Sequence, residues 1–262
     1  MVWTLVGIDC AAQEEHLGLA LGELDGNGAL KVSRVTLGTA GESAEATIAS
    51  WLSQADRPLI AINAPLGWPV DLGSALAGHT AGQPLTKPKR KRRVAPEDEA
   101  EQLLRRETER VVQTHTGRSP TETTAERMTR RALSALALLT RLRAASPVPL
   151  PLAWEPGRDS GVVEVCAEAT LRAHRIRAGS YRGRTHKARH ARSAIVEQLS
   201  SNMSIDVTPD LLTQNSDLLD ALICTLAAAD FARGLCVAPS DPQRAHREGW
   251  IWFRGDGQGS LF

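Results

Sequence analysis

The chain of 262 residues is long enough for one large domain or two small ones with a complete hydrophobic core. Its net charge of +1 excludes a uniformly acidic or basic protein, and an aromatic content of 4% argues against a surface that stacks many nucleobases. The four cysteines form no CxxC pair, which favours buried reduced thiols over zinc ligands or disulfides.

No targeting or membrane segment is expected. Residues 1–12 lack the basic start of a secretory signal peptide and contain Asp9. No apolar run approaches the roughly 20 residues that cross a bilayer. Together with the free cysteines, these features predict a cytoplasmic protein without a membrane partner. The sequence is compatible with a homodimer, but no feature indicates one.

Three strands are predicted at the start of the chain. The apolar, β-branched run VWTLVGID at residues 2–9 predicts a central strand that carries Asp9 at its carboxyl end. Two further strand patterns occupy residues 17–24 and 29–37, and the DGNG sequence between them favours a tight hairpin turn. The three strands are therefore expected to form an antiparallel meander.

A helix and a fourth strand follow. Apolar residues recur at helical spacing over 42–55, and LIAIN at 59–63 predicts a buried strand that ends at Asn63. The order strand, strand, strand, helix, strand predicts an α/β protein with an RNase H-like fold, in which a crossover helix places the fourth strand parallel to the first. Asp9 and Asn63 would then lie side by side at the carboxyl edge of the sheet, where open α/β sheets place their sites.

The middle of the chain is predicted to be an insertion. Residues 78–98 combine glycine, proline and the basic run TKPKRKRR, which favours a mobile loop. Helical patterns follow at 99–114 and 121–144, and four prolines between 147 and 156 mark an extended connection. We expect a single RNase H-like domain over 1–262, with a basic loop and helical insertion over about 70–156.

A fifth strand is expected to complete the sheet. VVEVC at 162–166 predicts a strand with Glu164 on one face and its neighbouring valines on the other. The five-stranded sheet would be mixed and flanked by helices, with the first three strands antiparallel and the fourth and fifth parallel. A helix is predicted over 187–201, and EGWIWF at 248–253 is predicted to add an edge strand.

The stretch NSDLLDALICTLAAADFARG at 215–234 predicts the helix on which the site depends. Asn215 can cap its first turn, and Gly234 can end it. Asp217 and Asp220 lie outside its apolar face and are three residues apart, so their carboxylates project close together. Such carboxylates repel each other, and a bound cation relieves the repulsion. The structural alternative is that both acids favour the positive end of the helix dipole.

Several motifs occur in an order that resembles known nucleases. An acid after the first strand and a DxxDA pair on a late helix resemble RuvC-type resolvases. A closer resemblance, running from the first strand to the C-terminus, is to the bacterial DUF429 family, a domain of unknown function described as predicted RNase H-like nucleases. The motifs that carry it are IAINAPLGWP (60–69), RRETER (105–110), VVEVCAEATL (162–171), SYRG (180–183), DLLDALICTLAA (217–228) and EGWIWF (248–253).

The chain departs from that family at three positions. The fourth strand of the family typically ends in Asp, and here the residue is Asn63. Glu109 replaces the Asp of the RETER-like segment, and the EVYP-like motif has become Glu164-Val165-Cys166-Ala167, which keeps its acid. An amide oxygen can coordinate Mg²⁺ but brings no charge, so a metal shared by Asp9 and Asn63 should bind more weakly. Three interpretations stay open: an impaired protein, compensation by another acid such as Glu164, or a residue altered to inactivate the protein.

The resemblance implies phosphodiester hydrolysis by a two-metal carboxylate mechanism. Two Mg²⁺ or Mn²⁺ ions would activate a water and stabilise the leaving oxygen. Asp9 would bridge the ions, with the acids of the late helix on one side and Asn63, Glu164 or Glu109 on the other. The candidate catalytic residues are Asp9, Asn63, Glu164, Asp217 and Asp220, and the candidate metal ligands are Asp9, Glu109, Glu164, Asp217 and Asp220.

Two basic segments suit a polyanionic partner such as a nucleic acid. Residues 87–93 hold six Lys or Arg, and residues 172–192 hold eight with no acid. Solvated loop faces and helix salt bridges are the structural alternatives. The candidate nucleic-acid-binding residues are Lys87, Lys89, Arg90, Lys91, Arg92, Arg93, Arg105, Arg182 and Arg184.

Three functions are compatible with these patterns. The first is a metal-dependent nuclease acting on DNA or RNA. The second is a non-catalytic nucleic-acid-binding protein on the same scaffold, favoured by Asn63 and the basic segments. The third is a phosphotransferase of the actin-like class, whose glycine-rich phosphate turns have no counterpart in the DCAAQ sequence at 9–13. The nuclease is the leading hypothesis.

Overall fold

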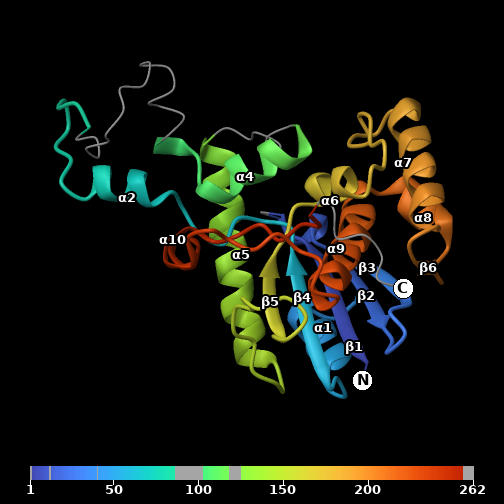
Figure 1. The fold of residues 1–262 in the computed structure, drawn as a ribbon. Helices are drawn as coiled ribbons and strands as arrows, with labels where there is room; N and C mark the ends of the chain where they lie inside the picture. The colour runs from blue at the N-terminus through green and yellow to red at the C-terminus, as the bar shows by residue number, and fades with distance from the viewer. Residues whose placement is uncertain (1, 12, 40, 86–102, 118–124, 256–262) are drawn as a thin grey trace.

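The computed structural model describes residues 2–255 except 12, 40, 86–102 and 118–124, and shows a mixed sheet with helices on both faces (Figure 1). The strand order is β5-β4-β1-β2-β3-β6. β1 pairs antiparallel with β2, and β2 with β3, whereas β4 runs parallel to β1, β5 to β4 and β6 to β3. The strands are β1 Trp3–Asp9, β2 Gly18–Leu24, β3 Leu30–Leu37, β4 Arg57–Ile62, β5 Gly161–Glu164 and β6 Ser204–Ile205.

The five predicted strands and their directions are confirmed, and two details of the prediction are wrong. The sheet has a sixth strand, β6, whose two residues are too short to leave a hydrophobic pattern. Residues 248–253 add no edge strand. Their nearest approach to the sheet is an isolated bridge between Ile251 and Glu164, because aromatic side chains there pack inward instead of alternating.

Helices surround the sheet, and four of the predicted ones lie close to their expected positions: α1, α5, α7 and α9. Within the predicted 99–114 helix, residues 103–104 are helical, residues 105–106 interrupt the helix before α4, and residues 99–102 lie outside the described residues. The helical elements are η1 Glu14–His16, α1 Ala44–Leu52, α2 Val70–Leu76, α4 Glu107–Thr116, α5 Ala125–Ala145, α6 Ala167–Ala173, α7 His186–Leu199, α8 Pro209–Gln214, α9 Ser216–Ala232 and α10 Pro242–Glu248. The predicted insertion thus contributes α2, α4 and α5, while its basic run at 87–93 lies outside the described residues. None of the described helices has the length and apolar character that a bilayer crossing requires.

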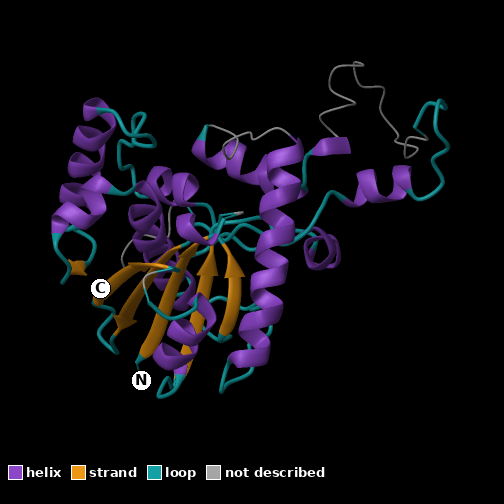
Figure 2. Ribbon diagram, turned by 180° about the vertical axis from the view of Figure 1, so that it is seen from behind, coloured by secondary structure: helices purple, strands orange, loops and turns teal. Residues whose placement is uncertain are grey.

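The two faces of the sheet are covered by different helices. Trp3 and Leu5 of β1 pack with the buried residues of α9, whereas Val6 and Ile8 pack with those of α1 and α5. Figure 1 shows α9 in front of the sheet, and Figure 2, seen from behind, shows α1 and α5 on the other side. Side chains alternate along a strand, so residues of odd number in β1 face α9. By the same alternation, Asp9 is directed to the α9 side.

Glycines let α9 lie directly on the sheet. A Cβ at Gly7 of β1 would lie 2.0 Å from the carbonyl oxygen of Ala221, and one at Gly18 of β2 would lie 2.1 Å from that of Asp217. Any larger residue would therefore push the helix away from the strands. The close contact places the first turns of α9 beside the carboxyl end of β1.

Candidate active site

Asp9 and Asn63 lie side by side at the carboxyl edge of the sheet. The backbone N–H of Asn63 donates to the carbonyl of Ile8 at 2.8 Å, so residue 63 extends the parallel pairing of β4 with β1. Asn63 Nδ2 then donates to Asp9 Oδ1 at 2.7 Å. Both side chains are buried, since 8% of Asp9 and 5% of Asn63 is exposed. The predicted neighbourhood of these two residues is thus present in the structure.

The direction of the Asn63 amide is fixed by its second contact. Asn63 Oδ1 accepts a hydrogen bond from the backbone N–H of Ala167 at 3.3 Å. If the amide were flipped, its NH₂ group would face that N–H, and two donors would oppose each other. Asn63 therefore presents NH₂ to Asp9 and keeps its oxygen for the start of α6.

Asp220 reaches the same edge from α9. Asn215 caps this helix by accepting from the N–H groups of Asp217 at 2.7 Å and Leu218 at 3.4 Å, as the sequence predicts. Asp220 Oδ1 accepts from the hydroxyl of Tyr181 at 2.6 Å, and Oδ2 accepts from Arg182 Nε at 3.1 Å and Nη2 at 2.9 Å. Tyr181 and Arg182 come from the loop between α6 and α7, which crosses over the start of α9.

Asp9 and Asp220 interact electrostatically. Burial, followed by the negative charge of Asp220, raises the pKa of Asp9 to about 8, and Arg131, Arg182 and the Asn63 hydrogen bond only partly oppose this shift. Burial also raises the pKa of Asp220, against the opposing effects of Arg182 and Tyr181. Two acids from opposite ends of the chain therefore share one desolvated region, where a cation or a proton is favoured.

Arg131 of α5 is a site residue that the sequence pattern did not reveal. Its Nη2 lies 3.4 Å from Asp9 Oδ1 and donates to the carbonyl of Asn63 at 2.7 Å, and its Nε donates to the carbonyl of Cys10 at 3.3 Å. Arginines are common on the polar faces of helices, so nothing local distinguished this one. Asp9 Oδ2, by contrast, accepts no hydrogen bond from any described residue.

Asp217 has different surroundings from Asp220 although both lie on α9. Its side chain is 26% exposed, and Oδ2 lies 3.3 Å from His16 Nδ1. Asp217 is not among the charges that shift the pKa of Asp9. The structure thus brings Asp220, but not Asp217, into contact with the charges around Asp9.

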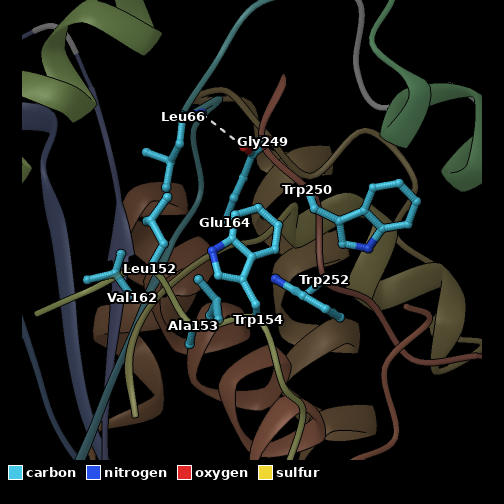
Figure 3. A pocket seen from close by; sticks show the side chains of 10 residues that line it. Leu66, Leu152, Ala153, Trp154, Val162, Glu164, Gly249, Trp250 and Trp252 are labelled. Carbon is cyan, nitrogen blue, oxygen red and sulfur yellow. Dashed lines mark hydrogen bonds between the residues drawn. The ribbon is translucent and has the colours of Figure 1, made fainter. Parts of the chain in front are cut away.

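Glu164 is directed away from Asp9 by the strand register. Glu164 of β5 pairs with Ile62 of β4, which pairs with Ile8 of β1, and these two isoleucines face α1 and α5. Asp9 and Asn63 are one residue further along and so face the opposite side. The Glu164 carboxylate instead accepts from the N–H of Leu66 at 2.9 Å, next to a small hollow lined by Trp154, Trp250 and Trp252 (Figure 3).

The buried side chain of Arg106 contacts two other predicted site acids, Glu109 and Glu164. Arg106 Nη1 and Nη2 donate to the two oxygens of Glu164 at 2.9 and 2.7 Å, and Nε donates to Glu109 Oε1 at 3.0 Å. Glu248 lies beside them and accepts from the N–H groups of Val70 at 2.9 Å and Glu107 at 2.7 Å. We call Arg106, Glu109, Glu164 and Glu248 the Arg106 cluster. It joins β5, α2, α4 and α10, and holds Glu109 and Glu164 through Arg106. We call Asp9, Asn63, Arg131, Arg182 and Asp220 the Asp9 region; none of its hydrogen bonds between described side chains involves Glu109 or Glu164.

Of the predicted nucleic-acid-binding residues, Arg182 and Arg184 are exposed near the site. They belong to a surface segment that also presents exposed Arg175, Arg177, Lys187 and Arg189. Arg105 donates to Gln113 at 2.8 Å on α4. Lys87, Lys89, Arg90, Lys91, Arg92 and Arg93 lie outside the described residues.

Asp9 and Asp220 are the acids of this region that could hold a divalent cation. Among the residues that the structure describes, no three His, Cys, Asp or Glu side chains gather as a group that could hold a metal. Asp9 and Asp220 nevertheless offer hard carboxylate oxygens, the kind that Mg²⁺ and Mn²⁺ prefer. Asp9 Oδ2 is not engaged by described residues, and the arginines beside the two acids are partly exposed, with 29% of Arg131 and 39% of Arg182 accessible. Both oxygens of Asp220 already accept hydrogen bonds, so a cation bound there would have to replace a contact with Tyr181 or Arg182.

Comparison with known proteins yields one match. The family model described as Protein of unknown function (DUF429) matches residues 7–244, which include Asp9, Asn63 and Asp220. No curated protein matches, and no solved structure matches.

Proposed function

We propose that this chain, which belongs to the DUF429 family, is a divalent-cation-dependent hydrolase of nucleic-acid phosphodiester bonds with low activity in its present sequence. The observation that carries the proposal is the convergence of Asp9 and Asp220, from β1 and α9, in one buried region. Buried acids whose pKa values are shifted by burial and a neighbouring charge are enriched at functional sites.

The topology supports an RNase H-like scaffold for this activity. A three-stranded antiparallel meander, a crossover helix and two parallel strands, with a late helix on the central strand, are the elements expected of that fold. The site lies outside the carboxyl ends of β1 and β4, where open α/β sheets place their ligands. The exposed basic segment from Arg175 to Arg189 lies beside it and suits a phosphate backbone.

The proposed roles follow from the contacts. Asp9 and Asp220 would hold Mg²⁺ or Mn²⁺, and the bound cation would activate a water and stabilise charge on the phosphate. Tyr181 orients Asp220 through its hydroxyl. Arg131 and Arg182 lie where they can contact phosphate oxygens, since guanidinium groups bind them in bidentate fashion. Asn63 limits the activity because it offers Asp9 an NH₂ group instead of a second carboxylate.

The decisive experiment is the Asn63→Asp substitution. A carboxylate there can still accept from the Ala167 N–H, but its other oxygen faces Asp9 where the amide now donates across 2.7 Å. We expect the variant to unfold at a lower temperature than the wild type in chelator, to be restored by Mn²⁺, and to cleave at least one of a panel of single-stranded, duplex, hybrid and branched substrates about 10²-fold faster.

The control for this experiment is the double variant Asn63→Asp with Asp220→Asn. It removes the second acid while keeping the new one, so cleavage should return to the wild-type level or below. A folded Asn63→Asp protein that binds Mn²⁺ and cleaves none of the substrates would refute the catalytic proposal.

A second candidate is a nucleic-acid-binding protein without catalysis on the same scaffold. The contacts of Asn63 favour it, because the amide and Arg131 satisfy Asp9 Oδ1 without any metal. This candidate predicts salt-sensitive binding that does not depend on Mn²⁺, and no cleavage by either form of residue 63.

A further inference from the structure

The loop that carries Arg182 is rigid on both sides of that residue. Arg192 of α7, which is 2% exposed, donates through Nη1 to the carbonyls of Tyr181 at 2.6 Å and Gly183 at 2.9 Å. Tyr181 is itself buried and holds Asp220 Oδ1 at 2.6 Å. The backbone around Arg182 is thus held by hydrogen bonds, whereas the arginine side chain is 39% exposed.

Arg182 and Arg131 differ in how firmly they are held. Arg131 donates to the backbone carbonyls of Asn63 and Cys10 in addition to its contact with Asp9. Among the described residues, the Arg182 guanidinium contacts a single acceptor atom, Asp220 Oδ2, and the face of Tyr181, whose ring centre is 5.4 Å away. Losing Asp220 as a partner would therefore release Arg182 but not Arg131.

Arg182 also stands between the carboxylate and the exposed basic segment. Exposed Arg184 and Lys187 follow it at the start of α7, and Arg177 precedes it. A guanidinium that turns outward from Asp220 thus joins a surface of like charge. That arrangement is unfavourable unless a polyanion is present to bind it.

We propose that Arg182 is an exchangeable counter-charge: it neutralises Asp220 when no divalent cation is bound, and turns to a phosphate group of the nucleic acid when a cation takes Asp220 Oδ2. This inference rests on the proposed cation site and adds an order of events to it. The cation and the nucleic acid bind cooperatively, because the first releases the arginine that the second needs.

The test measures binding, independently of cleavage. Mn²⁺ affinity is measured by calorimetry for the wild type, Arg182→Gln and Arg184→Gln, the last being a matched loss of one exposed charge two residues away. We expect Arg182→Gln to bind Mn²⁺ about tenfold more tightly, because its competing charge-assisted contact is gone, and Arg184→Gln to change little. Arg182→Lys, which keeps the charge without the bidentate contact, should fall between the wild type and Arg182→Gln.

The second measurement is the affinity for a phosphorothioate single strand that resists hydrolysis. Arg182→Gln should weaken binding severalfold with Mn²⁺ present and have little effect in chelator, whereas Arg184→Gln should weaken it equally in both. Equal Mn²⁺ affinity of the wild type and Arg182→Gln, or an equal effect of Arg182→Gln on strand binding with and without Mn²⁺, would overturn the inference.

The outcomes separate this inference from the proposed function. If no variant binds Mn²⁺, both fail. If Mn²⁺ and strand binding change as expected while Asn63→Asp cleaves nothing, the exchange of Arg182 stands and catalysis does not.

Discussion

The Asp9 region and the Arg106 cluster both combine arginine with buried carboxylates, but the two regions differ in burial of the arginines and in the pKa shifts that result. In the Arg106 cluster, Arg106 is 1% exposed and Glu164 is 3% exposed, and both Glu164 oxygens accept from Arg106. Burial alone would lower the pKa of Arg106, but Glu164 and Glu109 hold it above its ordinary value. In the Asp9 region, burial and the charge of Asp220 raise the pKa of Asp9, burial raises the pKa of Asp220, and the arginines beside the two acids are partly exposed.

The two regions contain the same residue types but differ in two respects: the solvent exposure of the arginines, and whether every carboxylate oxygen accepts a hydrogen bond. We use these two properties to distinguish a structural ion pair from a functional one. The carboxylates of the Arg106 cluster are met by backbone N–H groups and a fixed guanidinium, so a ligand would have to displace protein contacts. Asp9 keeps one oxygen free of hydrogen bonds from described residues. We therefore assign stability to the first region and ligand exchange to the second.

Replacing Arg106 by Met should test this assignment with the largest effect. The change leaves the buried Glu164 carboxylate without its partner, and removing one member of a buried pair lowers the free energy of unfolding by about 3–5 kcal/mol. Urea unfolding measures it. Arg158→Met is the control, because the Arg158 side chain is 82% exposed and should change stability by less than about 0.5 kcal/mol. If Arg106→Met and Arg158→Met both had equally small effects on the free energy of unfolding, the Arg106 cluster would not be a stabilising ion pair.

The Gly7→Ala substitution should have a smaller effect on stability and a specific effect on the Asp9 region. The new Cβ would meet the carbonyl oxygen of Ala221 at 2.0 Å, so α9 must shift away from β1, at a loss of about 1–3 kcal/mol. Asp220 moves with α9, whereas the Arg106 cluster does not lie on that helix. We expect weaker Mn²⁺ binding together with the lower urea midpoint.

Gly73→Ala on α2 is the matched control for Gly7→Ala. No atom lies within 4 Å of a Cβ at that position, and alanine is the better helix former by about 1 kcal/mol. It should leave Mn²⁺ binding unchanged and stability unchanged or higher. If Gly7→Ala kept the wild-type affinity for Mn²⁺, the close packing of α9 would not be what positions Asp220.

The sequence pattern foresees the backbone of the site better than its side-chain partners. Local hydrophobic periodicity marks the two strands, and the crossover helix between them predicts that they are parallel, which together place Asp9 and Asn63 at the same edge of the sheet. The same alternation puts Glu164 on the other face, which becomes evident only when the register with Ile62 is known. Register depends on tertiary pairing, and a single sequence does not fix it.

Contacts between segments that are distant in the sequence could not be predicted from the sequence pattern. The orientation of the Asn63 amide depends on the Ala167 N–H, and the neutralisation of Asp220 depends on a loop that also had a surface interpretation. The SYRG motif did carry a signal, since Tyr181 and Arg182 both contact Asp220. Arg106 lies in the RRETER motif, but the motif did not reveal its buried contact with Glu164. Arg131 had no signal, because an arginine on a helix is ordinarily solvated.

The smallest predicted effect is a dependence of stability on pH that belongs to Asp9 alone. The pKa of Asp9 is raised to about 8 in the folded protein, above the value of 3.8 for an unburied aspartate. Folding then stabilises the protonated form, so this contribution is complete below pH 3.8 and is lost as the pH rises through 8. Between pH 7 and 8 the free energy of unfolding of the wild type should fall by about 1 kcal/mol relative to Asp9→Asn, which has no proton to lose there.

Urea unfolding of the wild type and Asp9→Asn at both pH values measures this difference, and Glu15→Gln, an exposed acid near Asp9 in the sequence, serves as the control. Parallel slopes for the wild type and Asp9→Asn would mean that Asp9 is ionised throughout and that the Asn63 amide and Arg131 already neutralise it. A steeper slope for the wild type would mean that a cation must displace a proton from Asp9. Mn²⁺ affinity should then rise from pH 6 to 8, because fewer Asp9 side chains carry a competing proton. The proton on Asp9 and the Arg182 guanidinium on Asp220 would then be the two charges that Mn²⁺ replaces.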